Sequence, residues 1–472
     1  MMKRKLIALL LASLLIVTLF AGCKDNSEMN VAYTNSQSGS QWNMGFGSRQ
    51  IIPDESSEEP LYIAGYNNGL EIEGVLDYCE AKAVWMDTGA EGILLIGVDC
   101  VALDSGVVKQ IREKLSDISG CAAVNVYSTH THAGIDTLGM WGPIGVDGKN
   151  DAYMEALITA AVDAARDAAA SRTPGSLYYG SVLTEDMYRD SRYPEIFDAN
   201  LYHLRFAPDD GSAGIRMYFY GAHAESLRGD NAKLSRDFPG VLCDKMRDAT
   251  GDNAMFFPGA IGGLIMTKAF VNDTGKDALL NLRITSNLLV AYAKKITPDN
   301  ERQLSPNMAL SRVEFTIPMD NTAFMLYKFL GILTNQAVPA DSATGYGVRT
   351  ELSVLMLDDI ALTLIPGEIF PELVYGGEFT GANPDGENPP TLMEIAESFG
   401  INQLLIVGLS NDEIGYIVTP SDFLLNVDLP YIEKIEDFKH ENHYEETNSV
   451  GPECANFIAE AFRRALEALN GF

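Results

Sequence analysis

The chain has 472 residues, of which 46% are hydrophobic, and it carries a formal net charge of −31 at pH 7. This excess of acidic side chains excludes nucleic acid as a partner, because phosphate contacts need a basic face. The length is ample for a large hydrophobic core and allows one large domain or two or three smaller ones.

The first residues form a targeting segment rather than part of the fold. A basic start at residues 3–5 precedes an apolar run over residues 6–20, which is followed by Ala21-Gly22-Cys23. The pattern resembles a bacterial lipoprotein signal, in which residues 1–22 are removed as a signal peptide and the thiol of Cys23 carries the lipid. The alternative is an uncleaved anchor, but a run of about 15 apolar residues is short for a membrane span, which needs about 20. We therefore expect an extracytoplasmic lipoprotein that is anchored to the bacterial cell membrane through Cys23.

Residues 23–42 are polar and show no apolar periodicity, which predicts a flexible tether after the lipidated cysteine. Removal of residues 1–22 takes away three basic side chains and brings the net charge from −31 to −34. Such a body is repelled by an anionic membrane, so that attachment depends on the lipid.

Strand-like and helix-like segments then alternate along the chain. Residues 91–98 and 122–127 have the apolar composition of buried strands, and residues 105–119 between them have the spacing of an amphipathic helix, which gives a βαβ unit. Further elements of the first half are predicted as helices at 151–170, 238–249 and 275–296 and as strands at 177–183, 215–220 and 254–257.

The polar stretch 297–306 marks a candidate internal seam, after which β-hairpins become more frequent. Predicted strands at 352–357 and 360–365 flank the turn Asp358-Asp359, followed by a strand at 404–407 and a helix at 452–469. The polar segment 420–449 is long for a loop and is interpreted as a lid. The sequence thus predicts an α/β fold of mixed sheets, with βαβ units in the first half and more β-hairpins in the second, in one large domain over residues 43–472.

Five cysteines remain after Cys23, and they are widely spread without a Cys-x-x-Cys pair. This pattern is typical neither of a disulfide framework nor of a thiolate metal site. Isolated buried thiols are expected, with room for one bridge that the sequence does not assign.

The first group of candidate metal-binding or catalytic side chains is Thr129-His130-Thr131-His132, directly after the predicted strand 122–127. The chain has only six histidines, and two of them lie one residue apart at a strand end, where ligand crevices form in open α/β sheets. Imidazole is also the commonest protein ligand of zinc. The alternative is a pair of structural histidines that end a strand.

Three other predicted strands end in polar side chains of the same kind. His223 follows strand 215–220, Glu368 follows strand 360–365 and Tyr416 comes after strand 404–407. Taken singly, a glutamate after Pro-Gly most often caps the following helix, and a tyrosine in a loop most often packs against its neighbours. Together, however, these strand ends could supply the nitrogen and oxygen ligands of a zinc site with an open position for water. Glu225 is interpreted as a solvated side chain, or alternatively as a residue that orients a ligand. The remaining histidines are interpreted as structural or solvated: His203, His440 and His443.

These residues give the chain a resemblance to the neutral (non-lysosomal) ceramidases, over roughly residues 40–470. The family's Thr-His-Thr-His-Ser-Gly motif is matched by residues 129–134. Further segments similar to those of the family then follow in the same order: Ala222-His223, Pro366-Gly367-Glu368, Gly415-Tyr416-Ile417-Val418-Thr419 and His443-Tyr444-Glu445-Glu446.

The resemblance implies a zinc-dependent hydrolase of an N-acyl amide, with zinc-activated water as the nucleophile. It implies four zinc ligands, His130, His223, Glu368 and Tyr416. It also implies three catalytic residues. His132 acts as general acid and base, and Tyr444 and Arg192 steady the oxyanion or position a small-molecule or lipid substrate, with Arg189 as the alternative to Arg192.

The sequence departs from the family in three places. Residues 259–266 lack the serine of the family's Asn-Leu-Ser-Pro segment, the spacing from Tyr416 to Tyr444 is expanded, and the sequence ends before the family's carboxyl-terminal immunoglobulin-like domain. A substrate other than ceramide is therefore considered, and so is a non-catalytic lipoprotein that binds a lipid or cell-wall ligand. A serine hydrolase is disfavoured, because no Gly-x-Ser-x-Gly motif occurs.

Overall fold

The computed structural model describes residues 29–54, 59–184, 186–268, 277–377, 381–437 and 440–470. The predicted signal peptide and Cys23 lie outside the described residues. Within the described part of the chain, no helix has both the length and the apolar character needed to cross a membrane.

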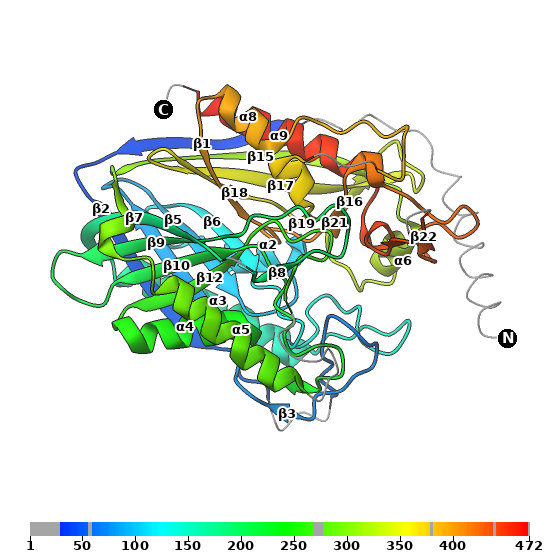
Figure 1. The fold of residues 1–472 in the computed structure, drawn as a ribbon, viewed down its shortest axis with the longest axis horizontal. Helices are drawn as coiled ribbons and strands as arrows, with labels where there is room; N and C mark the ends of the chain where they lie inside the picture. The colour runs from blue at the N-terminus through cyan, green and yellow to red at the C-terminus, as the bar shows by residue number, and fades with distance from the viewer. Residues whose placement is uncertain are drawn as a thin grey trace.

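Two large mixed β-sheets form the centre of the molecule (Figure 1). The nine-stranded sheet has the order β12 (Asn253–Pro258), β10 (Ile215–Tyr220), β9 (Asn200–Pro208), β7 (Thr173–Leu183), β2 (Trp42–Gln50), β4 (Glu80–Asp87), β5 (Gly92–Val98) and β6 (Cys121–Ser128), with β14 (Arg302–Leu304) paired to β7. The six-stranded sheet has the order β1 (Asn30–Ser38), β15 (Asn307–Met319), β17 (Tyr346–Leu357), β18 (Ile360–Leu364) and β20 (Gln403–Val407), with β16 (Gln336–Pro339) paired to β17.

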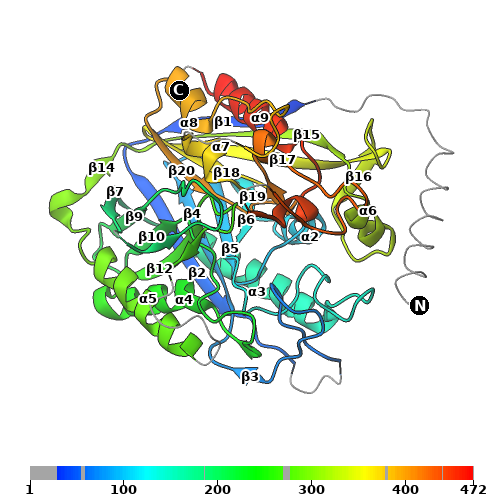
Figure 2. The same cartoon turned by 45° about the vertical axis from the view of Figure 1, so that its right-hand side comes forward.

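Helices cover the outer face of each sheet, which makes a four-layer sandwich (Figures 1 and 2). One hydrophobic cluster lies between the sheets, with Met44 and Val84 from the first and Leu355 and Leu362 from the second. Other clusters pack the helices onto the outer faces. The nine-stranded sheet carries α2 (Ser105–Lys114), α3 (Asp151–Ala170), α4 (Asp237–Thr250) and α5 (Ala278–Ala293), and the six-stranded sheet carries α6 (Thr322–Phe329), α7 (Pro371–Tyr375), α8 (Leu392–Ser398) and α9 (Cys454–Ala468).

The predicted fold class is confirmed, including the βαβ unit. Strands β5 and β6 pair in parallel, and α2 connects them. The Asp104 side chain caps α2 by accepting a hydrogen bond from the backbone N–H of Val107 at 3.2 Å. The helix ends at Lys114 rather than at residue 119, because the chain must turn before it enters β6, and Gly120 completes this turn with φ of +75°.

The tether predicted for residues 23–42 is wrong for residues 30–38. These residues form β1, which pairs antiparallel with β15 at the edge of the six-stranded sheet. Side chains along β1 alternate between partly buried and exposed. A polar edge strand of this kind carries no apolar run that sequence patterns would detect.

The candidate seam at residues 297–306 is the place where the chain passes between the two sheets. Strand β14 still pairs with β7 of the nine-stranded sheet, whereas β15 lies in the six-stranded sheet. The predicted hairpin around Asp358-Asp359 is present as β17 and β18, with Asp358 at φ of +58°.

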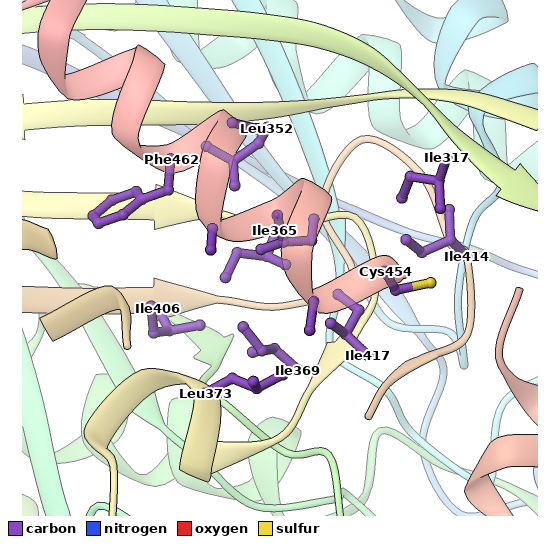
Figure 3. Packing of buried hydrophobic residues seen from close by; sticks show 14 of the residues in the cluster. Ile317, Leu352, Ile365, Ile369, Leu373, Ile406, Ile414, Ile417, Cys454 and Phe462 are labelled. Carbon is purple, nitrogen blue, oxygen red and sulfur yellow. The ribbon is translucent and has the colours of Figure 1, made fainter. Parts of the chain in front are cut away.

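Two short strands, β19 (Glu368–Ile369) and β21 (Tyr416–Ile417), pack in the hydrophobic cluster on the outer face of the six-stranded sheet. Ile369, Ile414 and Ile417 pack in the same cluster as Phe462 of α9, as Figure 3 shows. The remaining short elements are β3 (Gly74–Val75), β8 (Tyr188–Arg189), β11 (Lys233–Leu234), β13 (Met266–Thr267), β22 (Ile435–Glu436), β23 (Asn442–His443), η2 (Pro298–Asn300), η3 (Pro420–Asp422) and η4 (Glu445–Asn448).

Candidate metal centre

The four strand ends singled out in the sequence converge at one place between the two sheets. His130 follows β6 and His223 follows β10, and a parallel bridge between Thr131 and Ala224 joins the two segments. Glu368 and Tyr416 are direct partners in the parallel pair β19 and β21. Because β19 follows β18 and β21 follows β20, each sheet contributes two of the four side chains.

Three imidazoles and one carboxylate meet at the centre. The Nε2 atoms of His130 and His132 are 3.1 Å apart, and Oε2 of Glu368 lies 2.9 Å from Nε2 of His223 and 3.4 Å from Nε2 of His130. Ligands bound tetrahedrally to zinc at 2.0–2.1 Å lie about 3.3 Å from one another, so this spacing suits a single ion. The group His130, His132 and His223 can therefore hold a metal ion.

Backbone carbonyl groups orient two of the imidazoles. Nδ1 of His130 lies 2.7 Å from the carbonyl oxygen of Val101, and Nδ1 of His223 lies 2.9 Å from that of Ile265. Each Nδ1 therefore carries a hydrogen atom and donates a hydrogen bond to the carbonyl oxygen. This orientation directs Nε2 to the centre, as is usual for metal-binding histidines. His130 adopts φ of +63°, a conformation that a residue with a side chain rarely adopts and that places its ring in the site.

The same geometry leaves room for a cation in the centre. His223 faces an acceptor oxygen with both ring nitrogens, so that either a second proton or a metal ion must lie between Nε2 and Glu368. Burial opposes ionisation of Glu368, but the adjacent His130 and His223 lower the pKa of its carboxyl group strongly. A buried, ionised carboxylate among imidazoles is a donor set suited to zinc. Burial and the nearby Glu368 raise the pKa of Tyr416 well above its ordinary value.

His132 has a different environment from the other two imidazoles. Its Nδ1 lies 3.8 Å from Oε2 of Glu225 and has no hydrogen-bond partner among the described residues. The Tyr66 hydroxyl donates to the same Glu225 oxygen, and the Tyr66 ring meets the His132 ring edge-on at 5.2 Å. A Cβ atom on Gly65 would lie 2.6 Å from the His132 ring. Burial and the neighbouring imidazoles lower the pKa of His132 well below its ordinary value.

Gly65 and Tyr66 are not predictable from the sequence, because their segment has neither a motif nor a periodic pattern. The solvated environment predicted for Glu225 is wrong, because its side chain is buried, with 7% of the residue exposed. The proximity of Glu225 to His223 in the sequence was the one available signal for a role in the site.

An apolar cavity opens next to the centre. His130, His132, Glu368 and Tyr416 line one part of it, and Tyr444 also lines it. The rings of Tyr416 and Tyr444 lie 6.3 Å apart, and partial burial together with Glu368 raises the pKa of Tyr444 to about 12. The other lining residues are mostly apolar and include Val101, Leu138, Trp141, Met319, Phe324 and Val348.

Arg192 lies in an environment other than the one the resemblance implies. Its guanidinium group forms ion pairs with Asp422, Glu445 and Glu446, and it is not among the described residues that line the cavity. Arg189, the alternative, is exposed on β8, which pairs with β13.

The altered segment 259–266 contributes to the centre through its backbone. The carbonyl group of Ile265 holds His223, and the Gly262 N–H donates to the carbonyl of Ile369, next to Glu368, at 2.9 Å. A Cβ atom on Gly262 would lie 2.5 Å from the Phe370 ring, so this position requires the close approach that glycine allows. The segment therefore supports two of the candidate ligands without a hydroxyl or acidic side chain.

The remaining histidines lie outside the centre. His203 is buried and lies 2.8 Å from Glu301, His443 is buried beside Glu446, and His440 is exposed. The five cysteines after Cys23 are all free thiols: Cys79, Cys100, Cys121, Cys243 and Cys454.

Comparisons with known proteins identify the same fold. A crystal structure of neutral ceramidase from Pseudomonas aeruginosa matches with a TM-score of 0.69 at 16% identity, over 91% of this chain and 74% of that chain. A ceramidase described as complexed with C2 matches with a TM-score of 0.68 at 17% identity, over 91% of this chain and 75% of that chain. No protein-family model and no curated protein matches the sequence. The chain thus shares the fold of neutral ceramidases, and the predicted relationship is confirmed at the level of the fold.

Proposed function

We propose that the chain is a zinc-dependent hydrolase of N-acyl amides, and that the apolar cavity accepts the acyl chain. The observation that carries the proposal is the position of the Glu368 carboxylate beside two imidazoles. Its Oε2 lies 2.9 Å from Nε2 of His223 and 3.4 Å from Nε2 of His130. Backbone carbonyl groups orient both imidazoles. The ceramidase fold supports an amide as the substrate, because the two similar structures are ceramidases.

In this proposal His130, His223, Glu368 and Tyr416 hold the zinc ion. A zinc ion at this position supplies Lewis acidity and lowers the pKa of a neighbouring water. His132 is assigned to proton transfer rather than to the metal, because its Nδ1 faces the Glu225 carboxylate instead of a backbone carbonyl. The alternative assignment makes His132 the third imidazole ligand.

The side chains around the centre then divide the reaction between them. His132 takes a proton from the attacking water as the new carbon–oxygen bond forms, and it donates this proton to the amine nitrogen as the carbon–nitrogen bond breaks. Glu225 lies 3.8 Å from Nδ1 of His132, where its charge favours the protonated ring, and Tyr66 donates a hydrogen bond to Glu225. Tyr444, at the cavity wall, donates a hydrogen bond from its hydroxyl group to the oxygen of the amide carbonyl as negative charge develops there, and it keeps its proton. The products are a carboxylic acid and an amine.

Metal content and amide hydrolysis measured on the same purified variants test this assignment. The mature wild-type protein is expected to contain one zinc ion per chain by plasma mass spectrometry and to lose hydrolysis of an N-acyl amide in the presence of a chelator. His130→Ala and His223→Ala should lose the zinc, whereas His132→Ala should keep it and lose at least about 100-fold in kcat, as expected for a general acid–base residue.

His203→Ala is the matched control, because His203 is equally buried and pairs with Glu301 away from the centre. It should retain both zinc and activity. A wild-type protein without stoichiometric metal would refute the proposal. Loss of zinc in His132→Ala would instead favour the alternative set of three imidazoles.

A non-catalytic protein that binds a lipid or cell-wall ligand is the second candidate. The observation that favours it is the absence of a hydroxyl or acidic side chain in the described residues 259–266. It predicts that the zinc-loaded protein binds an N-acyl amide, measured by calorimetry, but releases no amine over hours of incubation.

A further inference from the structure

Arg192 is among the most enclosed charged residues of the described chain, with 2% of its surface exposed. Its Nη1 donates to Oδ2 of Asp422 at 2.6 Å, and its Nη2 donates to Oε2 of Glu445 at 3.0 Å and to Oε2 of Glu446 at 2.9 Å. The two nitrogens therefore hold two separate segments, one at η3 and the other at η4.

The second of these segments is the one that carries Tyr444. Helix η4 begins at Glu445, directly after Tyr444, and both Glu445 and Glu446 are almost fully buried. On the other side of Tyr444, Nδ1 of His443 lies 2.6 Å from Oε1 of Glu446. Tyr444 itself is 40% exposed at the cavity wall, and its carbonyl oxygen accepts hydrogen bonds from the N–H and the hydroxyl group of Thr447 in η4, at 3.1 Å and 2.7 Å.

Arg192 also contacts the segment that carries Glu368. Its guanidinium carbon lies 5.4 Å from the centre of the Phe370 ring, and the Phe370 N–H donates to the carbonyl of Ile417 at 3.1 Å. Phe370 and Ile417 directly extend β19 and β21, which hold Glu368 and Tyr416. The guanidinium group of Arg192 therefore contacts both the segment that carries Tyr444 and the segment that carries Glu368.

We propose that Arg192 is a positioning residue that fixes Tyr444 over the reacting carbonyl by holding Glu445 and Glu446, and that it does not contact the substrate itself. The proposal rests on the proposed amide hydrolysis. A buried ion-pair cluster adds little to net stability compared with apolar packing, and its best-documented use is to select one geometry among several. Arginine suits this use because its planar fork reaches carboxylates in two directions, whereas lysine offers a single charged point.

A double-mutant cycle with Tyr444 tests the proposal. Arg192→Lys is expected to lower kcat roughly 10-fold with little change in KM or in zinc content, because a misplaced donor loses transition-state stabilisation. Tyr444→Phe should lower kcat further, and the double variant should match Tyr444→Phe alone. If the loss of kcat in the double variant equalled the product of the losses in the two single variants, Arg192 would act independently of Tyr444, and the proposal would be overturned. An unchanged kcat in Arg192→Lys would overturn it as well.

The matched control is Arg205→Lys, because Arg205 also pairs with a buried glutamate, Glu301, with Nη2 and Oε2 2.6 Å apart. Arg205 lies on β9, outside the residues that line the cavity, so this variant should keep the wild-type kcat.

A readout that needs no activity separates this proposal from the proposed function. Fluorotyrosine placed at position 444 should give one sharp ¹⁹F resonance in the wild type and a broadened or divided one in Arg192→Lys and in Glu445→Gln. Glu445→Gln serves if Arg192→Lys does not fold, since it keeps the shape of the side chain and removes one charge. Unchanged resonances in the folded variants would overturn the positioning role. If the wild type hydrolyses no amide, the proposed function fails, and the resonances still decide whether Arg192 holds Tyr444.

Discussion

Gly65 lies against the ring of His132, and its φ of +108° belongs to a region that favours glycine. A methyl group at this position would overlap both Cγ and Nδ1 of the ring. The ring would have to move toward the centre or rotate away from Glu225. His132 therefore depends on a residue without a side chain for its position.

We predict that Gly65→Ala lowers kcat for amide hydrolysis by about 100-fold while the zinc content stays at the wild-type level, since a displacement of about 1 Å is enough for such a loss. Steady-state kinetics and plasma mass spectrometry on one preparation provide the measurement. Gly69→Ala is the control: Gly69 has positive φ in the same loop, but nothing lies within 4 Å of its added Cβ, so it shares the backbone strain without the clash. Equal losses of kcat in both variants would attribute the effect to the loop rather than to His132.

At this scale, the sequence was sufficient for residues that end buried strands. His130, His223 and Glu368 each follow an apolar run, and the edges of adjacent strands bring their ends together. Gly65, Tyr66 and the burial of Glu225 follow from how a loop folds back on the site, and no local pattern encodes such a contact. The direction of the Arg192 side chain likewise depends on three carboxylates that are distant in the sequence.

Helix α2 and the segment after β20 are joined through one buried carboxyl group. Oδ1 of Asp412 accepts hydrogen bonds from the N–H of Ser105, at the start of α2, at 2.7 Å and from Nδ2 of Asn335 at 2.6 Å. Burial, and secondly the charge of Asp104, raise the pKa of Asp412 to about 7. The native state thus retains a proton that the unfolded state releases near pH 4.

This shift predicts that the contribution of Asp412 to stability is complete below about pH 4 and is lost as the pH rises toward 7, because the native state then binds more protons than the unfolded state. The melting temperature should therefore fall between pH 5 and pH 8, and in Asp412→Asn the fall should be smaller by about 3 °C or more. Thermal unfolding followed by circular dichroism at both pH values measures this difference. Asp209→Asn, at an exposed position after β9, should reproduce the wild-type fall, and a fall of wild-type size in Asp412→Asn would contradict the assignment.

Long elements were predictable, whereas very short ones were not. Helix α3 and strand β10 coincide with their predicted ranges, because each shows a clear periodic or apolar run. Strands β19 and β21 have two residues each, which is too short for any periodicity, although they carry Glu368 and Tyr416. Their formation depends on the core around Ile369 and Ile417 (Figure 3).

At the scale of the whole molecule, the two halves of the chain exchange strands. The amino-terminal β1 completes the sheet of the second half, and an antiparallel bridge from Tyr127 to Ser410 joins the two sheets near the centre. The sequence predicted the class of fold but not the sandwich, because the pairing of β1 with β15 involves residues far apart in the chain. A polar edge strand also resembles a linker in composition.

This pairing places the body of the protein close to the predicted lipid. Only residues 24–29 separate Cys23 from the start of β1, and so short a segment spans at most about 25 Å even when fully extended. The net charge of −34 on the chain after removal of residues 1–22 repels an anionic surface, so attachment would depend on the lipid. We predict that Cys23→Ala moves the full-length protein from the membrane fraction to the soluble fraction of the producing cell and abolishes labelling with radioactive palmitate.

The purified variant should retain the wild-type kcat on a soluble short-chain amide, because Cys23 lies outside the catalytic machinery. Its activity on a long-chain amide embedded in membranes should fall, by a factor that reflects the lost local concentration. Cys121→Ala, at a half-buried thiol on β6, should leave the fractionation unchanged. If Cys23→Ala remained in the membrane fraction and was washed off only by detergent, the apolar run at residues 6–20 would have to be an uncleaved anchor, and the lipid would not be the attachment.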